Sequence, residues 1–192
     1  MKRLLALLAI VSSGMSFASE LDAVVDLVQA TVLDSTVGAQ MIDWKVGDEM
    51  NYRLSSSMFR GTVKKEVFEV TEETLWLRQK SVVQFFGQTQ EDLMETELER
   101  ATGKVLRMIH NGEEQEVPDD SGDIEIIEQT YTEVEVPAGK FDSVYLKLNT
   151  KDVKNLELWV NPRDTVMDGS LKMIAPAQMT VTLELTSFKK GE

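Results

Sequence analysis

Three groups of polar residues in this sequence have types and spacings that could do chemistry, and the first is a lone histidine. Histidine is the usual general base, and His110 is the single one, directly before the turn pair Asn111-Gly112. A catalytic histidine is held beside its nucleophile, whereas a hairpin tip is open to solvent, and no serine follows the strand-to-helix turn typical of hydrolases. We therefore interpret His110 as a polar residue that flanks a turn.

The second group begins like a calcium loop. Asp119, Ser121 and Asp123 occupy the first, third and fifth positions, which supply oxygen ligands in such loops. The sixth position is Ile124 instead of glycine, and the twelfth is Thr130 instead of glutamate. The spacing excludes an EF-hand and indicates an acidic turn, so we predict no metal site.

The third group consists of carboxylates crowded into one predicted strand: Glu91, Asp92, Glu95, Glu97 and Glu99. Paired carboxylates can act as acid and base when one of them is kept from water. The last three alternate with less polar residues, which indicates the wet face of a strand, where charges also limit edge-to-edge aggregation. We predict no catalytic site and no cofactor, and hence no enzyme.

Composition excludes further classes of protein. The 192 residues include no cysteine, so a disulfide framework and a thiolate metal site are excluded. A net charge of -13 argues against a nucleic-acid partner. The hydrophobic fraction of 42% and the length fit one globular core.

The first 18 residues have the layout of a secretory signal peptide. Lys2 and Arg3 precede an apolar run over 4–11, and Ser16 and Ala18 fit the small residues before a cleavage site. The run is too short to cross a bilayer. We expect cleavage after Ala18 and a periplasmic or secreted protein that does not span the membrane.

The remaining residues, 19–192, predict a single domain with a leading helix. Apolar residues of the segment 20–34 recur at spacings of three and four: Leu21, Val24, Val25, Val28 and Val32. From about Met50 onward the pattern alternates, with turn signals about every ten residues. This pattern predicts an all-β fold with one N-terminal helix and a strongly curved antiparallel sheet of about nine to ten strands, a half-barrel or open barrel.

One face of the predicted strands is apolar. We expect this face to line a site for an apolar ligand through Leu75, Leu77, Leu106, Met108, Leu146, Leu158, Met179 and Leu183. A curved sheet closed by one helix leaves apolar surface uncovered, and methionines can line an adaptable pocket. Filling of a closed core is the alternative role for the same residues.

The opposite face carries large aromatic side chains in phase with charged neighbours: Trp76, Tyr145 and Trp159. They could pack beneath the helix, pair across strands or form a surface that meets a partner protein.

The segment 136–143 reads V-P-A-G-K-F-D-S, and 158–162 reads L-W-V-N-P. These motifs resemble a group of exported bacterial β-proteins of unassigned function that share a V-P-A-G-x-F turn before a strand. That group is similar in layout to the periplasmic lipoprotein carriers, the LolA/LolB-like half-barrels. The resemblance implies an early helix and a curved sheet with an apolar concave side, and it assigns no functional residue.

The sequence therefore predicts an exported periplasmic binding protein that holds an apolar small molecule, a lipid or a lipidated envelope partner. The alternative is a non-catalytic structural or interaction module of the cell envelope. An outer-membrane barrel is less well supported, because its aromatic girdles need more Trp and Tyr than this chain has. The oligomeric state and the ligand stay open.

Overall fold

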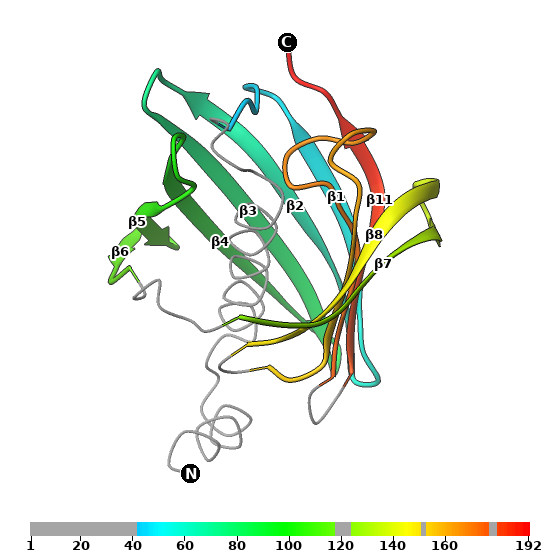
Figure 1. The fold of residues 1–192 in the computed structure, drawn as a ribbon. Coiled ribbons are helices and arrows are strands. Elements are labelled where there is room, and N and C mark those ends of the chain that lie inside the picture. The colour runs from blue at the N-terminus through cyan, green and yellow to red at the C-terminus, as the bar shows by residue number, and fades with distance from the viewer. Residues whose placement is uncertain (1–41, 118–123, 151–152, 177–179) are drawn as a thin grey trace.

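The computed structural model describes residues 42–117, 124–150, 153–176 and 180–192, and Figure 1 shows their arrangement. They form one antiparallel sheet of eleven strands. The strands are β1 (Glu49–Ser55), β2 (Phe59–Val70), β3 (Thr74–Phe85), β4 (Gln88–Glu99), β5 (Val105–His110), β6 (Glu113–Gln115), β7 (Glu125–Val136), β8 (Gly139–Asn149), β9 (Leu156–Val160), β10 (Ser170–Ala175) and β11 (Val181–Lys189).

The strand order is β6-β5-β4-β3-β2-β1-β11-β10-β9-β8-β7. Every pair except β1–β11 joins strands that follow each other in the sequence. The sheet has two edges, β6 and β7, and it curves strongly without closing (Figure 1). The first and last described strands meet at its centre, so one long-range pairing joins its two halves.

The predicted fold class is wrong in two respects. The sheet has eleven strands, not nine to ten. The extra count includes β6, whose three residues are all exposed and therefore show no alternation in the sequence. The leading helix is not supported either, because the described residues contain no helix. The segments 1–18 and 20–34, predicted as signal peptide and helix, lie outside the described residues.

The predicted antiparallel sheet is confirmed, and burial follows the alternation of the sequence. In β4, Asp92, Met94, Thr96 and Leu98 are buried while the residues between them are only half-buried. We call the face of the sheet that carries these buried residues the inner face, and the opposite one the outer face. In the described part of the chain, no helix is long and apolar enough to cross a membrane.

The core lies on the inner face and draws buried apolar residues from both halves of the sheet. At one end, the turn between β7 and β8 folds back onto β11. There the Ala138 amide donates a hydrogen bond to the Leu185 carbonyl at 3.0 Å. Val134 and Val136 are buried under this turn, whereas the first nine residues of β7 are exposed.

Candidate functional site

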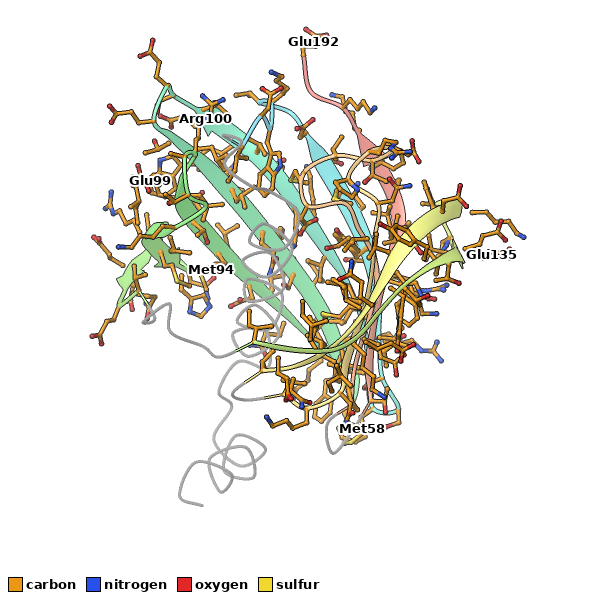
Figure 2. All side chains as sticks on the ribbon, viewed as in Figure 1. Met58, Met94, Glu99, Arg100, Glu135 and Glu192 are labelled. Carbon is orange, nitrogen blue, oxygen red and sulfur yellow. The ribbon has the colours of Figure 1, made fainter. Side chains whose placement is uncertain are left out.

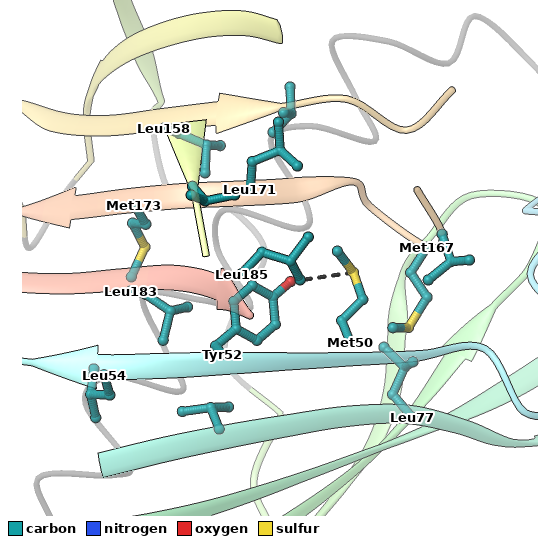
Figure 3. Close-up of a cluster of buried hydrophobic side chains, with 14 of the residues drawn as sticks. Met50, Tyr52, Leu54, Leu77, Leu158, Met167, Leu171, Met173, Leu183 and Leu185 are labelled. Atoms are coloured by element: carbon teal, nitrogen blue, oxygen red, sulfur yellow. Dashed lines mark hydrogen bonds between the residues drawn. The ribbon is translucent and has the colours of Figure 1, made fainter. Parts of the chain in front are cut away.

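An apolar row crosses five neighbouring strands of the inner face. Leu54 of β1 lies opposite Leu183 of β11, which lies opposite Met173 of β10. Met173 in turn lies opposite Leu158 of β9, and Leu158 lies opposite Leu146 of β8. None of the five side chains is more than 3% exposed. Residues opposite each other in antiparallel strands share a face, so this apolar row is one continuous strip, part of which Figure 3 shows.

The structure brings together only some of the predicted lining residues. Leu146, Leu158 and Leu183 belong to the apolar row, and Leu75 and Leu77 lie in the same core on β3. The others are placed differently: Leu106 is 43% exposed, Met108 is half-buried and Met179 lies outside the described residues.

The exposure of Leu106 has a physical cause. Arg107 pairs with Glu97 and Val105 pairs with Leu98, so Leu106 is an unpaired bulge residue. A bulge shifts the alternation by one residue, so Leu106 does not point to the inner face as the alternation in the sequence predicts. The structure therefore does not place Leu106 in the core that holds Leu75 and Leu77.

A buried polar cluster, formed by Tyr52, Lys65, Asp168 and Ser170, lies beside the apolar row. Lys65 Nζ is 3.5 Å from Asp168 Oδ2, and neither side chain is more than 3% exposed. The Asp168 Oδ1 accepts a hydrogen bond from the Ser170 amide at 3.1 Å. The Asp168 Oδ2 and the Ser170 Oγ have no hydrogen-bond partner. The cluster thus holds charge and unused hydrogen-bonding capacity away from water.

Tyr52 joins the polar cluster to the core. Its hydroxyl lies 3.2 Å from the Ser170 carbonyl and 3.3 Å from Met50 Sδ, and the second contact is drawn in Figure 3. Burial of the ring, and then the negative charge of Asp168, raise the pKa of Tyr52 well above its usual value of 10.0. The phenol is therefore a neutral hydrogen-bond donor at physiological pH.

A hollow of about 10 Å³ lies where the polar cluster meets the apolar row. Its lining includes Tyr52, Lys65 and Ser170 from the cluster and Leu158, Met173 and Leu183 from the row. This volume is about that needed for one water molecule. A larger and more polar hollow of about 520 Å³ lies between the β1–β2 and β3–β4 turns, at the end of the sheet where Figure 2 labels Met58.

His110 ends β5, and its side chain contacts a partner that the sequence does not predict. Its Nε2 lies 2.5 Å from Asp92 Oδ1, and the Asn111 side-chain amide donates to the same oxygen at 3.0 Å. Asp92 is 3% exposed, and its Oδ2 has no hydrogen-bond partner. The imidazole is one-fifth exposed and is held in place by a buried carboxylate.

The other carboxylates of β4 lie on the outer face. Glu95 pairs with Arg78 at 2.8 Å, and Glu91 pairs with Lys80 at 2.8 Å. Among the described residues, no group of three or more acidic or histidine side chains could hold a metal ion. Asp119, Ser121 and Asp123 lie outside those residues.

The three outer-face aromatics do not form one surface. The rings of Tyr145 and Trp159 are 4.9 Å apart, and the ammonium group of Lys172 lies 5.8 Å from the Trp159 ring. Trp76 lies on β3, and the four strands β2, β1, β11 and β10 separate it from β9. All three side chains are half-buried. The structure thus gives cross-strand packing at two separate places.

The sequence analysis missed Lys65, Asp168 and Ser170, and it did not predict the burial of Asp92. A signal exists for Lys65 and for the burial of Asp92, because Lys65 alternates in phase with Val63 and Val67, and Asp92 alternates in phase with Met94. A charged residue at an apolar phase predicts a buried polar site. Asp168 precedes β10 and Ser170 begins it, and no alternation marks either residue.

Comparison with known proteins does not assign a family. No protein-family model matches the chain, and no curated protein matches it. The predicted V-P-A-G-x-F group therefore has no support from a sequence family.

Three solved structures to which the chain is similar are the following. One is a Bacteroides fragilis protein described as exported, with a YmcC-like fold, at 12% identity and a TM-score of 0.42, over 79% of this chain and 100% of that one. A β-barrel-like protein of unknown function from Brucella abortus has 7% identity and a TM-score of 0.48, over 78% and 99%. MucB in complex with MucA(peri) has 14% identity and a TM-score of 0.44, over 87% and 56%. At these values no residue role is carried over.

Proposed function

We propose that this protein is a non-catalytic binding protein of the cell envelope that holds an apolar ligand, such as an acyl chain of a lipid or of a lipidated partner, against the inner face. The observation that carries the proposal is the apolar row, which crosses five strands of a single open sheet. The row is at most 3% exposed, so an acyl chain has to enter by repacking the side chains around it. Burial of the ligand's own hydrocarbon, at about 25 cal/mol per Å² removed from water, is then what drives binding. The envelope location rests on the signal-peptide layout of the first 18 residues.

The composition of the inner face supports a site that can adapt to ligands of different shape. Met50 and Met173 are at most 2% exposed, and thioether side chains can repack around chains of different shape. The polar cluster beside the row offers hydrogen-bonding groups to the polar end of an amphipathic ligand. A ligand with one apolar chain and one polar group matches both features.

The alternative prediction, a module that meets a partner through Trp76, Tyr145 and Trp159 together, has less support. Four strands separate the first aromatic from the other two. Each group also packs against neighbours on its own part of the outer face, as the 6.1 Å spacing of Phe68 and Trp76 shows.

A pair of tryptophan variants on β10 tests the proposed ligand site. Met173→Trp adds bulk to the apolar row, whereas Ile174→Trp adds the same ring to the outer face one residue away. With a fluorescent fatty acid as the probe, we expect Met173→Trp to weaken binding by at least about tenfold and Ile174→Trp to bind as the wild type does. Circular dichroism confirms that both variants fold. A folded Met173→Trp protein with unchanged affinity would contradict the proposed site.

A further inference from the structure

Strand β7 is an exposed edge of the sheet. It is the last strand in the order and pairs on one side with β8. All residues from Glu125 to Glu133 are exposed, although the strand has twelve residues and regular pairing from Glu128 onward. An edge strand presents unpaired backbone N–H and C=O groups that can pair with another chain.

The same stretch carries large apolar side chains in contact with solvent. Ile126 is 45% exposed, Ile127 is 47% exposed and Tyr131 is 83% exposed. Of the seven exposed large hydrophobic residues among those that the structure describes, these three lie on one strand. Exposed apolar side chains gathered along an edge are typical of a surface that meets a partner.

Charge indicates the kind of partner. Strand β7 contains no lysine or arginine and four carboxylates, which are Glu125, Glu128, Glu133 and Glu135. Like charges directly opposite each other across a strand pair are destabilising, and opposite charges are favourable. The edge therefore disfavours a second copy of itself and favours a basic strand.

We propose that the exposed edge of β7 binds an extended, basic segment of a partner protein, which adds to the sheet as a further strand. Backbone hydrogen bonds along β7 supply the affinity, and Glu128 selects lysine or arginine side chains, whereas Glu133 already pairs with Lys140 of β8 at 3.0 Å. The side chain of Tyr131 gives an apolar contact at the middle of the segment. This surface is separate from the apolar row, so it stands or falls independently of the proposed ligand site.

The first test uses a synthetic peptide that alternates lysine and threonine, with a fluorescent label, and measures its binding by anisotropy at low salt. A peptide that alternates glutamate and threonine is the charge control. We expect the lysine peptide to bind, and its affinity to fall with added salt because salt screens the carboxylates of the edge. Equal binding of both peptides overturns the proposal.

Two adjacent proline variants test the role of the backbone edge. N–H groups of neighbouring strand residues point to opposite sides, so one of Thr130 and Tyr131 donates toward β8 and the other toward solvent. Of Thr130→Pro and Tyr131→Pro, we expect the variant that loses a bond to β8 to have a lower melting temperature. The other variant should keep the wild-type melting temperature, and its affinity for the lysine peptide should fall by at least about tenfold. Unchanged peptide affinity in the stable variant overturns the proposal.

Charge reversal tests the same surface without a change in the backbone. Glu128→Lys on β7 is compared with Glu72→Lys, which makes the same charge change at the exposed β2–β3 turn. We expect a loss of lysine-peptide affinity of several-fold for the first variant only. Equal losses of affinity in the two variants would show that long-range charge is the cause, and they overturn the proposal. A wild-type dimer that the stable proline variant abolishes would show that the edge binds a second copy, which also overturns it.

Discussion

Lys65 occupies a position where strand alternation places an apolar side chain. Its ammonium group is removed from water and faces Asp168 at 3.5 Å. Two charges buried together are tolerated because each offsets the other, but one alone is strongly destabilising. The neighbouring Lys64 makes ion pairs with Glu49 and Glu66 from a side chain that is 43% exposed.

This contrast gives a prediction about stability. We expect Lys65→Met to lower the free energy of unfolding by about 3–5 kcal/mol, because it leaves the Asp168 carboxylate buried without a counter-charge. Lys64→Met should change it by no more than about 1 kcal/mol. Urea denaturation measures both. Adding Asp168→Asn to Lys65→Met should recover most of the loss, and a double variant as unstable as the single one would argue against the charge explanation.

Tyr52 gives a prediction about pH. Its pKa is raised in the folded state, so above pH 10 the unfolded chain releases the proton first and stability falls as pH rises toward the folded pKa. This group alone contributes a decline of at most about 1.4 kcal/mol per pH unit, reached once the unfolded tyrosine is fully ionised. We expect Tyr52→Phe to show a shallower decline between pH 10 and 11 in urea denaturation. Tyr131→Phe, at an 83% exposed site, should keep the wild-type slope.

At the scale of the elements, the connection between β9 and β10 depends on one glycine. Gly169 has a φ of 69°, and a Cβ atom there would lie 2.3 Å from the Pro162 nitrogen. Its carbonyl accepts a hydrogen bond from the Asn161 amide at 2.8 Å. The residue stands between the two residues of the polar cluster, Asp168 and Ser170, so this connection positions them.

Gly87 provides a matched control, because its φ is 79° and a Cβ there would meet nothing within 4 Å. We expect Gly87→Ala to cost about 1–2 kcal/mol of unfolding free energy from backbone strain alone. Gly169→Ala should cost about 1–3 kcal/mol more, because the backbone must also move. Thermal denaturation of the two variants measures the difference, and equal costs would show that the close approach is relieved without strain.

Most elements were predictable because their residues alternate. β4 and β11 show the alternation in both sequence and burial. Sequence phase fails where the register slips, as at the bulge that exposes Leu106, and where a strand is short and wholly exposed, as in β6. Both failures arise from pairing with a neighbouring strand, which a local pattern does not contain.

At the scale of the whole molecule, the inner face is assembled by pairing between distant segments. The apolar row joins Leu54 to Leu183 through the β1–β11 pair, which links the two ends of the described chain. The sequence predicted that Leu146, Leu158 and Leu183 face inward, but not which residues they meet across the strands. For the same reason it grouped Trp76 with Tyr145 and Trp159, which the strand order separates.

The central claim is that the inner face holds an apolar ligand, and native mass spectrometry of the protein purified from the cell envelope tests it most directly. Solvent extraction and lipid analysis then identify any bound species. We predict a stoichiometric mass increment from a lipid or acyl compound, or uptake of added fatty acid in its place. An unmodified apo mass with no uptake of added fatty acid would contradict the account.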